Sequence, residues 1–133
     1  MNTEGLIRRQ SSHGPADTLA RLRAEIKARG LTLFAHIDHA AGAREAGLPL
    51  RPTDVLLFGN ARGGTPLMQA QQTIGIDLPL KALVWQDAAG KTWLSYNDPH
   101  WFVRRHALSA NVEPAVDAMA SALAAMTQKA TEA

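Results

Sequence analysis

The sequence predicts an α+β fold, a two-layer sandwich in which helices pack against a mainly antiparallel sheet. Apolar residues recur at helical spacing in residues 15–30 and again in residues 111–128, and four segments rich in strand formers lie between them. The connections between these strands contain glycine, proline and short helical insertions. The expected order is therefore strand, helix, four strands and helix.

The first predicted elements are a short strand and an amphipathic helix. Residues 6–11 are mixed in character and are interpreted as the opening strand because a helix comes directly after them. Pro15 suits the first turn of that helix, where its missing N–H costs nothing. Gly30 ends the helix as a residue that adopts the left-handed conformation easily. The apolar face of the helix consists of Leu19, Leu22 and Ile26.

The second and third strands come next in the chain. Residues 31–38 are rich in strand formers and lie directly after Gly30. Their alternation predicts two faces. Leu33, Ala35 and Ile37 are expected on one face, and Phe34, His36 and Asp38 on the other. Residues 40–50 predict a short helical turn, and the apolar run in residues 54–59 predicts the third strand.

A glycine-rich turn leads from the third strand into a short helix. Thr65 is predicted to cap this helix, which extends to about residue 73 and ends before Gly75. Residues 80–85 and 92–96 then flank a four-residue loop that contains a glycine. This pattern predicts a hairpin built on a type I turn.

The C-terminal part of the chain is predicted to be helical. Residues 99–106 indicate a short helix or turn, and Asn111 is expected to cap a final helix that reaches about residue 128. A narrow apolar stripe runs along that alanine-rich helix. It consists of Val112, Val116, Met119, Leu123 and Met126.

Composition limits the possible functions. The 133 residues fit a single domain, and 46% hydrophobic with 20% charged residues is typical of a globular protein. The net charge is only +2, without a basic tract, so no nucleic-acid partner is expected. The absence of cysteine excludes disulfides, thiolate metal sites and cysteine nucleophiles. No secretion signal or membrane-length apolar segment is recognised, which predicts a cytoplasmic protein without a membrane partner.

Five short segments together resemble a bacterial and archaeal family, the domain-of-unknown-function family numbered 302. The similarity extends over roughly residues 6–108, the expected core of one domain over residues 1–133, to which the helix of residues 111–128 is added. The segments are AHIDH (35–39), LLFGN (56–60), GTPLM (64–68), DLPLK (77–81) and WLSYNDP (93–99). Relatives often have proline after the Gly-Asn pair, where this chain has Ala61.

The resemblance implies a TATA-binding-protein-like fold that is usually found as a homodimer. It implies no activity and no cofactor, because the function of the family is unassigned. Binding of nucleic acid does not follow from the fold name, since fold alone does not determine function. The chain also lacks the basic concave sheet that such binding requires.

The first candidate site lies at the end of the second predicted strand. His36 and Asp38 share a face of that strand, and His39 at its end is able to turn towards them. Two imidazoles and a carboxylate are suited to bind a metal, with His36 and His39 as ligands, or to form a base with an orienting acid. The alternative is a hydrogen-bonded strand end without a catalytic role.

The second candidate site is the glycine turn before the third helix. Residues 59–65 mimic a phosphate-binding loop but lack its lysine, and Arg62 is the nearby cation. The backbone N–H groups at a helix start are suited to bind an anion. The alternative is a turn that only closes the strand. The residues considered are Asn60, Arg62, Gly63, Gly64 and Thr65.

Three functions remain open at this point. The first is a homodimeric domain that binds a small polar or anionic ligand between residues 59–65 and the strand end at His36, Asp38 and His39. The second is a metal-assisted enzyme that uses those two histidines and Asp38. The third is a structural module for protein interaction.

Asp77, before Leu78 and Pro79, is interpreted as a turn residue.

Overall fold

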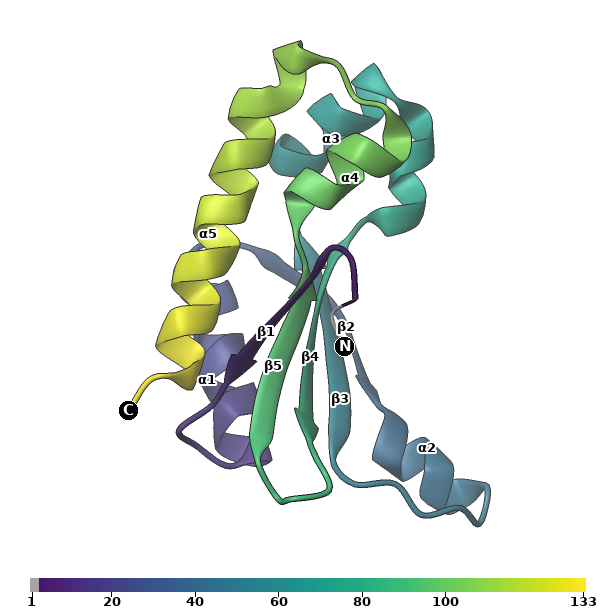
Figure 1. Cartoon of the computed structure of the whole chain (residues 1–133), viewed down its shortest axis with the longest axis vertical. Coiled ribbons are helices and arrows are strands. Elements are labelled where there is room, and N and C mark those ends of the chain that lie inside the picture. The colour runs from purple at the N-terminus through teal and green to yellow at the C-terminus, as the bar shows by residue number, and fades with distance from the viewer. Residues whose placement is uncertain (1–2) are drawn as a thin grey trace.

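The computed structural model describes residues 3–133 and contains one five-stranded antiparallel sheet with helices beside it (Figure 1). The strands are β1 (Leu6–Gln10), β2 (Thr32–Asp38), β3 (Thr53–Gly59), β4 (Leu80–Gln86) and β5 (Thr92–Asn97). The helices are α1 (Pro15–Ala28), α2 (His39–Glu45), α3 (Ala61–Ala70), α4 (Pro99–His106) and α5 (Glu113–Thr131), with 3-10 turns η1 (Gln72–Asp77) and η2 (Ala110–Val112). The predicted α+β sandwich is confirmed.

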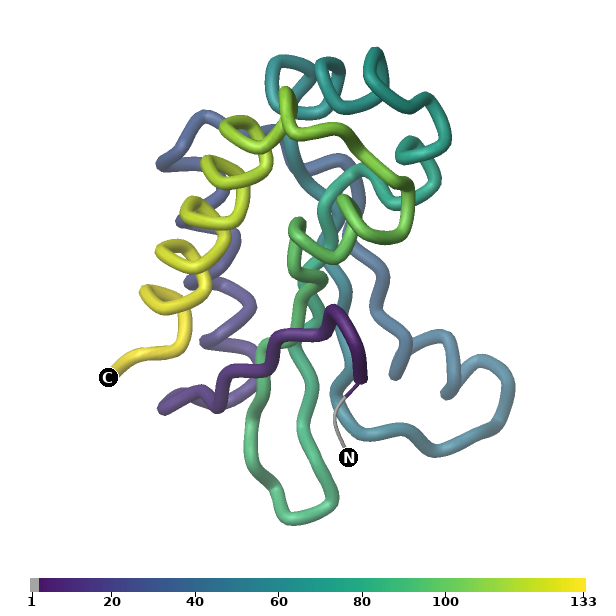
Figure 2. Tube along the Cα trace, turned by 45° about the horizontal axis from the view of Figure 1, so that its top comes forward, coloured from purple at the N-terminus to yellow at the C-terminus, as the bar shows by residue number. Residues whose placement is uncertain are grey.

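The strands are arranged in the order β1-β5-β4-β3-β2, and every neighbouring pair is antiparallel. The helices α1 and α5 lie side by side against one face of this sheet (Figures 1 and 2). Among residues 3–133, none of the helices combines the length and the apolar character needed to cross a bilayer.

The main hydrophobic core lies between the sheet and these two helices. Leu22 and Ile26 of α1 pack with Leu123 and Met126 of α5, as the predicted apolar stripes require. The sheet contributes the residues that point towards the helices. These are Leu56, Phe58, Ala82, Val84, Leu94 and Tyr96.

A second hydrophobic cluster lies at one end of the sheet, where α3, η1, α4 and η2 gather around the start of α5 (Figure 1). Its buried members are Leu67, Ile74, Phe102, Val112 and Val116. Two partly buried residues, Leu80 and Met119, pack against both clusters. The apolar interior is therefore divided into two parts that meet along α5 and the start of β4.

The start of the third helix differs from the prediction. It begins at Ala61 rather than after Thr65, because the Asn60 side chain accepts a hydrogen bond from the N–H of Gly63 at 2.7 Å and caps it. The helix includes Pro66 and ends at Ala70, and Gly75 lies inside the 3-10 turn that comes next. Much of the predicted glycine turn is thus the first turn of a helix, whose cap is Asn60.

The predicted alternation of β2 is wrong at one point. A register shift between Leu33 and Ala35 marks a β-bulge in the pairing with β3. The extra residue reverses the faces of the strand beyond it. Leu33 therefore packs against the main core, whereas Ala35 and Ile37 lie on the opposite face of the sheet, and Phe34 is left 56% exposed.

Candidate functional site

A cleft of about 610 Å³ lies between α3 and α5. Its floor is formed by the start of β2, the end of β3 and the start of β4. The residues that line it come from both hydrophobic clusters and from the segment between them, and they include Phe58, Met68, Leu80, Met119 and Leu123. The cleft is thus a gap between the two parts of the core.

Small residues keep this cleft open. Three alanines of α5 and two glycines of α3 line it: Ala115, Ala118, Ala122, Gly63 and Gly64. A Cβ atom at Gly64 would lie 3.3 Å from Cδ1 of Leu78, which is tighter than an ordinary contact. Glycine at this position therefore lets the helix approach the segment before β4 closely. The bulged residue Phe34 also lines the cleft.

The polar groups of the cleft gather at the start of α3. Arg62 is the one charged residue among the described residues of its wall, and its side chain is exposed. The side-chain oxygen of Asn60 is used by the helix cap, and its backbone oxygen accepts from the N–H of Gly64 at 3.2 Å. The N–H groups of Ala61 and Arg62 precede the first intrahelical donor and need a partner outside the helix.

His36 lies in a different environment, on the face of the sheet that bears the helices. Its Nδ1 is 2.6 Å from Nη2 of Arg23 on α1, and its Nε2 is 2.6 Å from Oδ2 of Asp54 on β3. Because a guanidinium only donates, Nδ1 must accept and Nε2–H must donate to Asp54. Both ring nitrogens of His36 are therefore already used.

The other two residues of the first candidate site have different contacts from those of His36. Oδ1 of Asp38 accepts a hydrogen bond from the N–H of Ala41 at 2.9 Å and caps α2. His39 is the first residue of that helix and lines a smaller hollow of about 320 Å³ beside Val55 and Trp85. Within residues 3–133, no group of three or more histidine, aspartate or glutamate side chains is placed to hold a metal ion.

The two predicted halves of the polar site are not brought together. In the β2–β3 pair, Thr32 is opposite Gly59, whereas Asp38 is opposite Asp54 at the other end. Six residues of strand correspond to roughly 20 Å. The prediction of one small ligand that contacts both segments is therefore wrong, because the antiparallel register places them at opposite ends of two strands. Gly63, Gly64 and Thr65 lie at the cleft, together with Asn60 and Arg62.

A buried polar cluster that the sequence did not reveal joins η1 to α4. Asp77 is only 8% exposed, and its two carboxylate oxygens lie 2.8 Å from Nη1 of Arg105 and 2.5 Å from Nε2 of His106. Nδ1 of His106 is 3.0 Å from the hydroxyl of Thr73. The sequence carries no signal for this cluster, because the aspartate and the two basic residues lie in separate elements.

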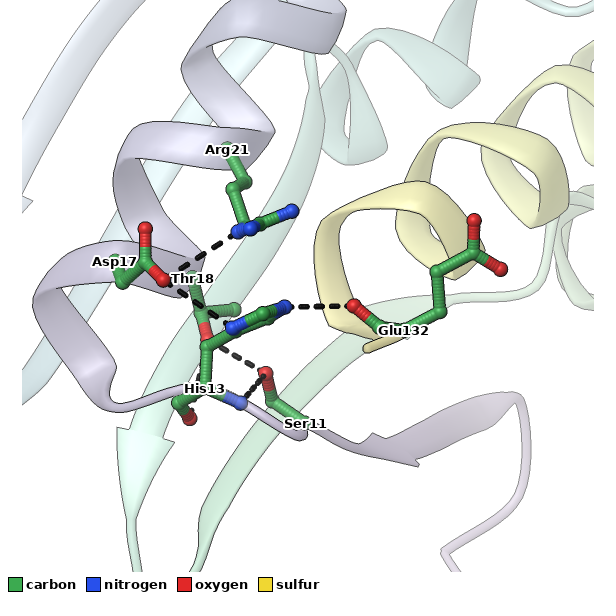
Figure 3. A network of polar contacts seen from close by, with 6 residues as sticks. All are labelled: Ser11, His13, Asp17, Thr18, Arg21 and Glu132. Carbon is green, nitrogen blue, oxygen red and sulfur yellow. Dashed lines mark hydrogen bonds and ion pairs between the residues drawn. The ribbon is translucent and has the colours of Figure 1, made fainter.

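A second histidine network fixes the end of α5 (Figure 3). Nε2 of His13 lies 2.6 Å from the backbone oxygen of Glu132, and Nδ1 lies 3.2 Å from Oδ2 of Asp17. Beside it, the hydroxyls of Ser11 and Thr18 are 2.6 Å apart. This network ties the start of α1 to the end of the helix that forms one wall of the cleft.

Known proteins that resemble this chain share its fold but indicate little about its chemistry. A protein of Bacillus stearothermophilus, solved as an uncharacterized conserved protein DUF302, superposes with a TM-score of 0.85 at 20% identity, covering 96% of this chain and 99% of that one. At this identity the likeness shows the fold alone.

Closer relatives occur in Brucella. A protein of Brucella suis named fluoride-specific ion channel FluC 1 is 45% identical over 126 residues, which are 95% of this chain and 50% of the relative. The FluC 1 protein of Brucella abortus has the same identity over 47% of its length. This chain thus spans about half the length of the curated relatives it matches. The model of the family described as domain of unknown function DUF302 matches residues 7–126, and the chain belongs to that family.

Proposed function

We propose that this domain binds a small molecule in the cleft between α3 and α5. The observation that carries the proposal is the cleft of about 610 Å³, which lies between two hydrophobic clusters. Binding pockets for small molecules have volumes of about 300–1,000 Å³ and are mostly apolar, with a few polar groups that orient the ligand. Here the polar groups are those at the start of α3.

The proposed ligand differs in character from the one predicted from sequence. A polar or anionic ligand was expected at residues 59–65, and these residues do line the cleft. The rest of its wall is apolar, so most of the contact would be with apolar groups. The guanidinium of Arg62 favours a ligand that carries a negatively charged group at one end.

A substitution that fills the cleft tests this proposal. Ala122→Leu adds three carbon atoms to the wall, and Ala120→Leu makes the same change on α5 outside it. Amide NMR spectra recorded with a fragment library should show shifts at Gly63, Gly64 and Ala118 in the wild type and in Ala120→Leu, but not in Ala122→Leu. Equal responses in all three proteins, or shifts elsewhere, would contradict binding in this cleft.

We also propose that the domain forms a homodimer through the sheet face that lies opposite α1 and α5. The register aligns the apolar residues Leu83, Val55 and Ile37 in a row on that face, which Ser95 and Arg8 continue. Ile37 is 44% exposed and Leu6 is 38% exposed. An apolar row on the outer face of a sheet is typical of an interaction surface, and the family resemblance favours a second copy of the chain as the occupant.

Light scattering during gel filtration tests the dimer. Leu83→Glu should convert a wild-type dimer into a monomer, because it places a charge in the middle of the row. Ile76→Glu is the matched control, since Ile76 is 72% exposed and lies in η1, away from this face. A wild-type monomer at high concentration, or a dimer that resists Leu83→Glu, would contradict the proposal.

A second candidate function is that of an accessory domain in a larger ion-transporting protein. It is favoured by the Brucella relatives, which are named fluoride channels and align with this chain over only half of their length. Since the aligned half folds here as an α+β sandwich, we expect the other half to conduct the ion. Fluoride efflux from liposomes should then persist, at an altered rate, when the Brucella suis protein lacks its aligned half. An unchanged rate, or complete loss of efflux from a folded protein, would contradict this role.

A further inference from the structure

We infer that the cleft accepts an amphiphilic carboxylate, with an elongated apolar body along α5 and the carboxylate at Arg62. This inference rests on the proposed function, since it names the class of ligand for the same cleft. It is drawn from the shape of the wall, its apolar composition and the position of its single charge.

The shape of the wall favours an elongated ligand. The residues of α5 that line the cleft extend from Ala115 to Met126 and recur at intervals of three and four. At 1.5 Å per residue, this stretch of helix is roughly 16 Å long. Small side chains at Ala118 and Ala122 leave room along it. A chain or a narrow ring system would therefore fit better than a compact polar molecule.

The composition of the wall favours an apolar body. On one side the cleft is bounded by Phe58, Leu123 and Met126 of the main core, and on the other by Met68 and Leu78, which pack against the second cluster. An apolar ligand would remove both surfaces from water and join the two parts of the core. Each additional methylene that is buried should tighten the dissociation constant about 4-fold until the cleft is filled.

The single charged residue of the wall, Arg62, favours a ligand with an anionic head group. Arg62 forms no ion pair within residues 3–133, and the described wall holds no aspartate or glutamate to repel an anion. A guanidinium binds a carboxylate through two parallel hydrogen bonds. The N–H groups of Ala61 and Arg62, which lack intrahelical partners, lie in the same turn and add donors for the second carboxylate oxygen.

Calorimetric titration with three probes separates the two parts of this inference. Decanoate combines a long chain with a carboxylate, hexanoate shortens the chain, and 1-decanol removes the charge. All are used below the concentration at which they aggregate. In the wild type we expect decanoate to bind at least 10-fold more tightly than either of the others.

Two substitutions assign those preferences to residues. Arg62→Met should make decanoate and decanol bind equally while the dependence on chain length is kept. Arg44→Met, an exposed arginine in α2 far from the cleft wall, is the control and should bind like the wild type. Ala122→Leu should weaken decanoate at least 10-fold, and Ala120→Leu should not. Melting curves of all variants confirm that each is folded.

The outcomes distinguish this inference from the proposed function. If decanol binds as tightly as decanoate, or if Arg62→Met has no effect, the carboxylate assignment is wrong but the cleft remains a binding site. If no probe binds while a fragment still responds to Ala122→Leu, the amphiphile class is wrong. If neither fragments nor probes respond to Ala122→Leu, the proposed function itself is wrong.

Discussion

The Nε2 atom of His106 on α4 lies 2.5 Å from the Oδ2 atom of Asp77 on η1. The same carboxylate receives Nη1 of Arg105 through its other oxygen at 2.8 Å. The guanidinium of Arg105 also lies 5.3 Å from the centre of the Trp101 ring. One aspartate thus fastens α4 to the segment that precedes β4, beside the second hydrophobic cluster.

Asp77→Asn should destabilise the domain by about 2 kcal/mol. The substitution removes the negative charge that both basic side chains face and leaves at most one acceptor oxygen for two donors. The free energy of unfolding in urea measures this loss. Asp117→Asn is the matched control, because the Asp117 carboxylate is exposed and its contact with His100 is long, at 3.6 Å. This substitution should change the free energy of unfolding by no more than about 0.5 kcal/mol. Equal effects of the two substitutions would argue against a structural role for Asp77.

Zinc should not stabilise the protein through His36. The ring nitrogens of this residue are occupied by Arg23 and Asp54, and Asp38 caps a helix. Metal binding would require these hydrogen bonds to break. Thermal melts of untagged wild type and His36→Gln should therefore respond to zinc in the same way. A rise in melting temperature that occurs only in the wild type would restore the metal-site hypothesis.

Gly5→Ala should destabilise the domain by about 2 kcal/mol or more. Gly5 has a φ of +75°, and a Cβ atom there would lie 2.4 Å from Cγ of Trp101. Alanine would therefore suffer both the cost of the left-handed conformation and a steric conflict with the indole.

Gly42→Ala should have the opposite effect on stability to Gly5→Ala. This residue lies inside α2, and a Cβ atom there would meet nothing within 4 Å. Alanine should stabilise the helix by about 0.5–1 kcal/mol. Chemical unfolding of both variants compares the two effects, and a stabilised Gly5→Ala variant would contradict the close approach of Trp101.

The pKa of Asp87 should lie below its ordinary value. The indole N–H of Trp93 has the largest effect, at 2.8 Å from Oδ2, and the backbone N–H groups of Lys91 and Ala89 and the charge of Lys91 add to it. A pKa that is lower in the folded state stabilises the protein above the ordinary carboxyl pKa of about 3.9. That contribution is lost as the pH falls through the depressed value.

Trp93→Phe tests the cause of this shift. The substitution keeps an aromatic ring but removes the N–H donor, so the pKa of Asp87 should rise towards its ordinary value. NMR titration of the Asp87 carboxyl carbon measures the change in both proteins. An unchanged pKa in the variant would show that the backbone N–H groups alone hold the carboxylate.

The sequence by itself determined the order and type of the main elements. The apolar spacing at Leu22 and Ile26 and at Leu123 and Met126 required two helices with one buried face each, and these helices do form the core. The hairpin resulted from local turn chemistry around Gly90. These features depend on contacts between residues that are close in the sequence, and periodicity and turn preferences reflect such contacts directly. The homodimer and the TATA-binding-protein-like assignment remain predictions.

Two local features, the start of α3 and the face alternation of β2, were predicted wrongly. Thr65 and Asn60 are both good caps, and only the observed hydrogen bond to Gly63 shows which one begins the helix. The bulge between Leu33 and Ala35 depends on how β2 pairs with β3, so the alternation within one strand could not reveal it.

Only the tertiary structure decided the site. The sequence grouped His36 with residues 59–65 through their polar character, but the antiparallel register separates them, because a strand keeps its two ends apart. The cleft, in turn, is formed by residues as distant as Phe34 and Ala122, which α3, β4 and α5 bring together. Its volume results from packing between elements, and no local pattern of residues encodes such a gap.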